Sequence, residues 1–292
     1  MSTYSMAQIE SLTGISAHTL RIWERRYSFL SPGRTKTNIR FYSDQELVKL
    51  LNISLLTRNG FKISKIDKMD ETDLHECVTN VLSNVTQDIE DEISGLTLCM
   101  LEMNEEEFQK IFQRRTNRKG LQVTITELIY PFLKEIEILW STNKLIPAQE
   151  HFISNLIRQK IITAIDSLPL PAIKAPTICM FLLEGEDHEM GLLLASYIAR
   201  DLGWRVIYLG QNVPVDNIKE VVRLSQPLLM FSMFVVNADQ KAAKLIAKIK
   251  AQTDVTFLVS GSQYNFTKVE MDEQVRFMSS PQELISHLQI KE

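Results

Sequence analysis

The sequence predicts a multidomain protein in which α-helical parts come first and an α/β part comes last. Up to residue 168, apolar residues recur at three- and four-residue spacing, which is typical of amphipathic helices. After a linker at 167–176 that contains three prolines, short and nearly continuous apolar runs alternate with helical segments. This alternation is typical of βαβ units around a buried parallel sheet. We therefore expect three domains, at residues 1–72, 75–168 and 176–292.

The composition agrees with an ordinary globular protein in the cytoplasm. Of the 292 residues 45% are apolar, but no uncharged apolar stretch reaches the roughly 18 residues that a membrane span needs. The first residues lack the basic and then apolar pattern of a signal peptide. The three cysteines are scattered and form no CxxC pair, so they fit neither a disulfide framework nor a structural zinc site. We expect no contact with a membrane.

Two helices separated by a glycine turn open the chain. We expect them at 5–11 and 16–27, with Gly14 in the turn and Ser16 as the N-cap of the second helix. This is the helix-turn-helix pattern, whose second helix can enter the major groove of DNA. Residues 1–60 hold eight Lys and Arg against four acids, so this head carries +4 and the remainder −8. The charge fits DNA binding, and it fits equally a solvated basic helix in a small helical domain.

A hairpin and a third helix complete the head. The segment "SPGRTKTNIRFY" at 31–42 predicts a hairpin with a polar tip, and Ser43 with Glu46 predicts a capping box for a helix that ends near Gly60. On the second helix Leu20 and Ile22 are expected to pack inward. The remaining polar side chains can reach bases and phosphates. The candidate DNA-binding residues are His18, Thr19, Arg21, Arg25, Arg26, Arg34, Arg40 and Tyr42.

The second and third parts differ in architecture. Residues 75–168 are expected to form a four-helix bundle, with Asn104 and Pro147 at two of the helix starts. The third part is expected to be a flavodoxin-like or Rossmann-like doubly wound sheet of about five parallel strands. Its strands are predicted at 177–183, 205–210, 228–236 and 255–261.

A single histidine stands in "EGEDHEMG", the turn that follows the first predicted strand of the sheet. Leu192 occupies the place where a zinc-protease HExxH motif needs a second histidine, and neither a P-loop nor GxGxxG is present. Doubly wound folds bind ligands at the carboxyl ends of strands, so His188 could be one axial ligand of a metal held by an organic ring. Glu186 could accept the other ring N–H, and Gly191 could admit a bulky group. From the residues alone, a polar loop rim explains the same pattern.

The first 70 residues resemble the winged-helix head of the MerR family of bacterial regulators. The resemblance rests on "YSMAQIESLTGISAHTLRIWERRY" and "RTKTNIRFYSDQEL". It implies that 16–26 is the recognition helix and that the hairpin bearing Arg34 and Arg40 is the wing. Most of the family continues into a long antiparallel dimerisation helix, and no such segment follows here.

The pattern Glu186-x-His188-x-x-Gly191 is similar to the cobalamin-binding signature of methionine synthase and corrinoid proteins, which is usually Asp-x-His-x-x-Gly. The resemblance implies that His188 is the lower axial ligand of cobalt. Ser232 then matches the family's serine beside the cofactor's tail. Gly261 matches one glycine of the usual Gly-Gly pair.

Trp140, Glu150 and His151 have the Trp-x9-Glu-His spacing of regulators that bind adenosylcobalamin, in which these residues cover its upper face. In photoreceptors of this kind a histidine can follow the tryptophan, whereas this chain has Ser141, a poor ligand for cobalt.

Together the resemblances imply a non-enzymatic transcription regulator of the CarH and LitR kind, a repressor that binds an operator in double-stranded DNA. They imply control by adenosylcobalamin, with light as a candidate signal, and a homo-oligomer of two or four chains. The alternatives are a cobalamin-independent regulator with a vestigial pocket and a corrinoid methyl carrier.

Overall fold

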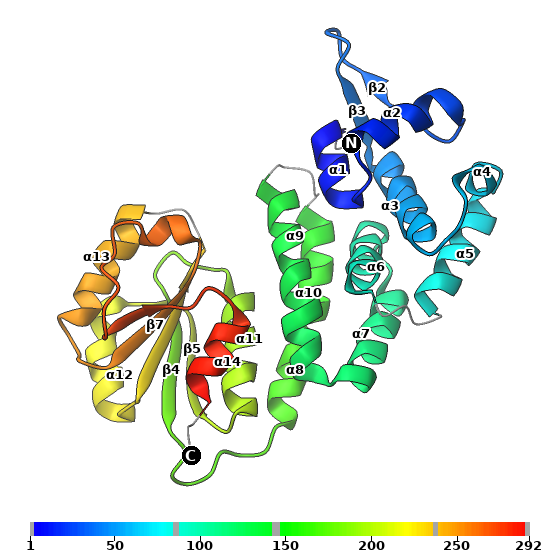
Figure 1. The fold of residues 1–292 in the computed structure, drawn as a ribbon. Helices are drawn as coiled ribbons and strands as arrows, with labels where there is room; N and C mark the ends of the chain where they lie inside the picture. Colours follow the sequence, from blue (N-terminus) through cyan, green and yellow to red (C-terminus); the bar gives the residue numbers. More distant parts are fainter. Residues whose placement is uncertain (1–2, 84–87, 142–146, 236–238, 290–292) are drawn as a thin grey trace. The chain divides into compact units, whose positions relative to one another are not determined.

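The computed structural model describes residues 3–83, 88–141, 147–235 and 239–289, without the side chains of 83, 137–141 and 239–241 (Figure 1). The chain divides into two compact units, Met1–Leu156 and Ile157–Glu292. The boundary falls inside a helix, so the three-part division expected from the sequence stays a prediction. In the described residues, no helix combines the length and apolar character that crossing a membrane requires.

The head is a small three-stranded antiparallel sheet with short helices. The strand order is β1-β3-β2, and the β2–β3 hairpin expected from the sequence is confirmed. The first strand, β1, was not expected, because three residues are too few to show a period. The elements are β1 (Thr3–Ser5), α1 (Met6–Thr13), α2 (Ala17–Arg26), β2 (Gly33–Arg34), β3 (Arg40–Ser43), α3 (Asp44–Arg58) and α4 (Ile63–Ile66).

Side-chain caps begin these helices where the sequence predicts them. The Ser16 side chain accepts from the Thr19 backbone N–H at the start of α2. Ser43 and Glu46 form the expected capping box of α3. The turn between α1 and α2 contains Gly14 at φ 67°, a left-handed conformation that favours glycine.

Helices follow the head in the described residues, as expected, but with α8 to α9 counted as one helix there are five of them up to residue 167, where four were expected. The segment from α8 through the π-helical η1 to α9 runs without interruption. The expected helix starts are confirmed, since Asn104 caps α7 and Pro147 begins α10. The elements are α5 (Glu71–Ser83), α6 (Ile89–Glu102), α7 (Glu105–Lys119), α8 (Leu121–Thr124), η1 (Ile125–Ile129), α9 (Tyr130–Ser141) and α10 (Pro147–Ser167).

The second unit is a five-stranded parallel sheet in the order β5-β4-β6-β7-β8, which is the flavodoxin-like order. Helices α11 and α14 cover one face, and α12 and α13 cover the other (Figure 1). Burial on both faces explains the continuous apolar runs of the strands. The elements are β4 (Thr177–Leu183), α11 (Glu189–Asp201), β5 (Arg205–Val213), η2 (Val215–Asn217), α12 (Ile218–Ser225), β6 (Leu229–Phe234), α13 (Asp239–Lys250), β7 (Thr256–Gly261), η3 (Gln263–Phe266), β8 (Val275–Phe277) and α14 (Pro281–Leu288).

Candidate functional site

The turn between β4 and α11 places Glu186 and His188 at the carboxyl end of the sheet. The Glu186 side chain is buried, and its Oε1 lies 2.6 Å from His188 Nδ1. Its Oε2 accepts from the Val235 backbone N–H, just beyond β6, at 2.7 Å. The strand order reverses between β4 and β6, so the pair sits at the switch point where doubly wound folds bind ligands.

The hydrogen bond expected between Glu186 and His188 is therefore present. An ionised carboxylate can only accept, so a neutral imidazole beside it carries its proton on Nδ1 and its lone pair on Nε2. The His188 side chain is 56% exposed, which leaves the ring accessible. This is the tautomer that a metal-ligating histidine needs.

The neighbouring strand β5 also holds this turn. Asn212, in a left-handed conformation at φ 56°, donates from Nδ2 to Asp187 Oδ1 at 2.7 Å. In the first turn of α11, Glu189 accepts from the Tyr208 hydroxyl at 2.9 Å, and burial together with this bond raises the pKa of Tyr208. None of these residues was among the predicted site residues, because nothing in a single sequence links β5 to a turn and a helix that precede it by about 20 residues or more.

Ser232 on β6 has a buried side chain whose hydrogen bonding is incomplete in the described part of the chain. The residue is fully buried, and within the described part of the chain its Oγ has no hydrogen-bond partner. Buried hydroxyls are normally paired, so this atom needs a polar group that the described part of the chain does not supply. A buried cofactor tail would supply one, so the residues present fit the group that the motif implies.

The two glycines of the predicted motif serve the protein's own packing. At Gly191, an added Cβ would lie 2.5 Å from the Met233 Sδ atom, so a flexible thioether fills the room expected there for a ligand. At Gly261, φ is 123° and an added Cβ would lie 2.1 Å from the Phe234 carbonyl oxygen. Only glycine fits that second position, whatever the site holds.

The upper-face residues expected from the sequence belong to the first unit. Trp140 and Ser141 lie in α9, but their side chains are outside the described part. On α10, Glu150 Oε2 lies 2.8 Å from His151 Nδ1, and Glu150 Oε1 accepts from the Ser154 hydroxyl at 2.6 Å. The carboxylate therefore orients a histidine whose side chain is 70% exposed.

On the head, α2 and the hairpin are tied together through one carboxylate. Glu24 accepts from Arg34 Nη2 at 2.7 Å and from Arg40 Nε at 2.5 Å. Burial alone would raise the pKa of Glu24, but these two bonds outweigh it and lower the pKa. On α2, Thr19 is partly buried and bonded to Ser16, and four of the candidate side chains are exposed: His18, Arg21, Arg25 and Arg26.

Tyr42 was wrongly expected to contact DNA. Its side chain is completely buried, as is that of Leu20, and its hydroxyl donates to Met6 Sδ at 3.3 Å. Burial raises the pKa of Tyr42 to about 12. The residue belongs to the core of the head, and Ile22 is only partly buried there.

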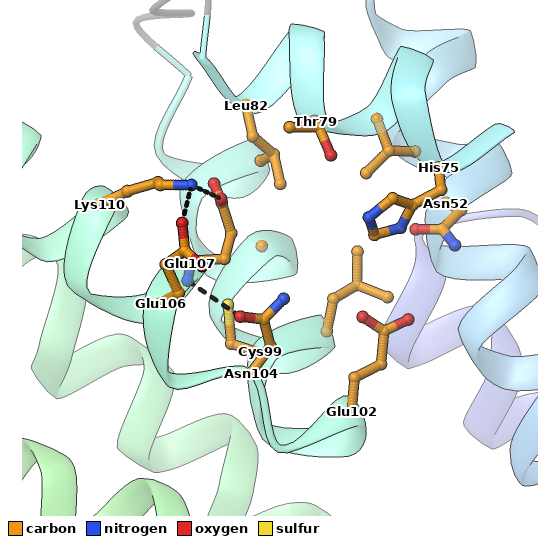
Figure 2. A pocket seen from close by; sticks show the side chains of 13 residues that line it. Asn52, His75, Thr79, Leu82, Cys99, Glu102, Asn104, Glu106, Glu107 and Lys110 are labelled. Carbon is orange, nitrogen blue, oxygen red and sulfur yellow. Dashed lines mark hydrogen bonds and ion pairs between the residues drawn. The ribbon is translucent and has the colours of Figure 1, made fainter. Parts of the chain in front are cut away.

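A separate cavity of about 170 Å³ lies between α3, α5, α6 and α7 (Figure 2). Lys110 on its wall pairs with Glu106 at 2.8 Å, and none of the predicted site residues lines it. Within the residues that the structure describes, no group of three or more His, Cys, Asp or Glu could hold a metal ion.

Two family models match separate parts of the chain. The model of the MerR HTH family regulatory proteins matches residues 4–72, and a B12 binding domain model matches residues 92–164. The B12 match ends at residue 164 in α10, so it covers none of the strands of the second unit.

Two curated relatives cover most of the chain. The HTH-type transcriptional repressor CarH of Myxococcus xanthus is 29% identical over 77% of this chain and 76% of its own. The repressor CarA of the same organism is 27% identical over 73% of this chain and 69% of its own.

A solved structure is similar in fold to about two thirds of the chain. The monomethylamine corrinoid protein of Methanosarcina barkeri aligns with 69% of this chain and 99% of its own, at a TM-score of 0.57 and 13% identity. The chain therefore carries a MerR-type helix-turn-helix domain and a B12-binding domain, and it is a homologue of the CarH and CarA transcriptional repressors.

Proposed function

We propose that this protein is a transcription regulator, a repressor, whose binding to operator DNA is controlled by adenosylcobalamin. The observation that carries the proposal is the Glu186–His188 pair at the switch point of the sheet, in a chain whose head matches the MerR family. When bound, cobalamin would supply a cobalt atom that can take a protein nitrogen as a ligand, together with a light-sensitive cobalt–carbon bond.

In this proposal His188 ligates the metal through Nε2, and Glu186 holds the imidazole in the required tautomer from Nδ1. Ser232 offers its buried hydroxyl to the cofactor's tail. Gly191 admits the group if Met233 moves aside, and Gly261 keeps the ends of β6 and β7 close together.

In this proposal the residues with the Trp-x9-Glu-His spacing serve the adenosyl group of the cofactor. Trp140 supplies an apolar wall, and Glu150 and His151 supply polar groups on α10. A change in this group would alter the packing of the helices that carry these residues, which is how the cofactor state would reach the DNA-binding head.

The head reads DNA through α2 and the hairpin. His18, Thr19, Arg21 and Arg25 face the major groove, and Arg26, Arg34 and Arg40 contact phosphates. A single head makes few contacts, so association into a dimer or tetramer would raise DNA affinity through multivalency. We propose a regulator in the cytoplasm, without catalytic activity, in keeping with the names of CarH and CarA.

The test is reconstitution with adenosylcobalamin in the dark, followed by an absorbance spectrum and DNA-binding titrations with and without the cofactor. His188→Ala should abolish the spectrum of protein-ligated cobalt. The matched control, His287→Ala on α14 of the same unit, should leave it unchanged.

Each alternative predicts a different outcome. A vestigial pocket predicts that wild type takes up no cobalamin. A corrinoid methyl carrier predicts methyl transfer and no operator binding. Illumination of the loaded protein tests light as a signal.

A further inference from the structure

A polar cluster joins the head to the helical bundle within the first unit. Arg58 ends α3, and it donates from Nε to Asp91 Oδ1 at 2.8 Å and from Nη2 to Ser94 Oγ at 2.9 Å, both on α6. Asn59 donates to the other oxygen, Asp91 Oδ2, at 2.8 Å. Asp91 is only 2% exposed, so head residues satisfy both oxygens of a buried carboxylate of the bundle.

The same guanidinium reaches toward the DNA-reading helices. Arg58 Nη1 donates to Ser54 Oγ at 3.3 Å, and Ser54 Oγ donates to the Thr13 carbonyl at 2.5 Å. Thr13 ends α1, and its own hydroxyl accepts from the Ile15 backbone N–H at 3.2 Å. Hydrogen bonds, joined through the covalent structure of Thr13, therefore connect α6 to the turn that sets the direction of α2. We call Ser54, Arg58, Asn59, Asp91 and Ser94 the Arg58 cluster.

Farther along the same helices the packing is incomplete. The cavity of about 170 Å³ lies there, and its lining includes Asn52 of α3 and Leu98 and Cys99 of α6. An unfilled space forfeits contact between the helices that surround it. The Arg58 cluster accordingly carries a larger share of the contact between α3 and α6, and a buried carboxylate resists losing its charged partner.

On its other side α6 contacts α9, the helix that bears Trp140. The Thr97 hydroxyl of α6 donates to Glu135 Oε1 of α9 at 3.2 Å. Helix α6 thus contacts both α9, the helix that bears Trp140, and α3 of the head.

We propose that the Arg58 cluster transmits a change in the helical bundle to the DNA-reading helix α2. Displacement of α6 must either move Arg58 or break its bonds, and both alter the support of the α1–α2 turn through Ser54. The inference rests on the proposed function only in assuming that the bundle responds to cobalamin. The hydrogen-bonded connection can be tested without any cofactor.

The first test is amide hydrogen exchange on the cofactor-free protein. Asp91→Asn is a change in the bundle. It removes the negative charge and places an amide NH₂ group against the N–H donors of Arg58 or Asn59. We expect the exchange of the Gly14 and Ile15 amides in the head to rise about tenfold or more. The matched control is Glu92→Gln, which breaks a buried ion pair with Arg115 (2.5 Å) inside the bundle.

The control should change exchange at those head amides by less than about twofold. Unchanged head exchange in Asp91→Asn, or an equal rise in Glu92→Gln, would overturn the proposal.

A second variant tests the same connection in case Asp91→Asn does not fold. Ser54→Ala cuts the connection on the head side and keeps the Arg58–Asp91 ion pair. Since both changes interrupt one chain of bonds, the double variant should exchange at Ile15 no faster than the faster single variant. If the two effects multiply instead, the residues act independently and no connection exists.

The last arm measures the ratio of operator affinities with and without adenosylcobalamin. Asp91→Asn should take up the cofactor with wild-type affinity and bring this ratio close to one. A retained ratio would overturn the inference. If wild type itself shows a ratio of one, the proposed function fails, and the exchange experiments still decide whether the cluster connects bundle and head.

Discussion

Glu186 offers the sharpest test of the candidate site, through the change Glu186→Gln. The carboxylate accepts hydrogen bonds from His188 Nδ1 at 2.6 Å, from the His188 backbone N–H at 3.2 Å and from the Val235 backbone N–H at 2.7 Å. An amide has a single oxygen. If that oxygen keeps the hydrogen bond from the Val235 backbone N–H, the amide NH₂ group faces His188 Nδ1. Nδ1 must then accept a hydrogen bond, so the proton of the imidazole moves to Nε2. The ligating lone pair is lost.

The size of the effect follows from these contacts. Losing a hydrogen bond to a charged group costs about 1.5–3 kcal/mol, so the free protein should lose stability of that order. Removing the carboxylate that supports a metal-ligating histidine typically weakens metal binding by about 10–100-fold. We expect cobalamin affinity to fall within that range, while the sheet stays folded because its apolar core is untouched.

The assay is a cobalamin titration followed by visible absorbance, with urea unfolding of the free protein in parallel. Glu184→Gln is the matched control, since it makes the same change on an exposed side chain two residues earlier and should leave affinity unchanged. Wild-type affinity in a folded Glu186→Gln would show that the carboxylate does not orient a metal ligand, and the reasoning would be wrong.

Three further predictions concern the head, the sheet and pH. Tyr42→Phe should leave operator affinity unchanged, because the ring is buried, whereas Arg21→Ala, on an exposed position of α2, should lower it in a fluorescence-anisotropy titration; equal losses would return Tyr42 to the DNA interface. Gly261→Ala should cost about 3 kcal/mol or more in urea unfolding, because its Cβ would meet a backbone carbonyl. Gly203→Ala, with φ 84° and nothing within 4 Å, should cost only about 1 kcal/mol, and similar values for the two would refute the clash. Burial raises the pKa of Glu135 to about 7, above its ordinary 4.5, despite the opposing influence of Thr97 and Arg58. Between those pH values the folded protein binds more protons than the unfolded chain, so stability should fall as pH rises from about 4.5 to 7, by up to roughly 3 kcal/mol, and then level off. Glu135→Gln should flatten this slope in urea midpoints measured across the range, and an unchanged slope would assign it to another group.

Local features of this protein could be predicted from its sequence. The caps Ser16, Ser43 and Asn104 form bonds within three residues along the chain, so their spacing reveals them. The strands of the sheet are buried on both faces, which forces continuous apolar runs. The Glu186–His188 pair was predictable for the same reason, because its members lie only two positions apart in the sequence.

The tertiary structure alone decided the contacts between distant segments. Tyr42 is buried because β3 lies between β1 and β2, and β1 is too short to show a period in the sequence. Gly261 is indispensable because of a carbonyl 27 residues earlier, and Arg58 finds Asp91 across a separation of 33 residues. Spacing along a chain cannot report such pairs, because they depend on which helices and strands pack together. The helix starts and the histidine turn of this protein were therefore set locally, whereas the support of that turn and the link between bundle and head were set by packing.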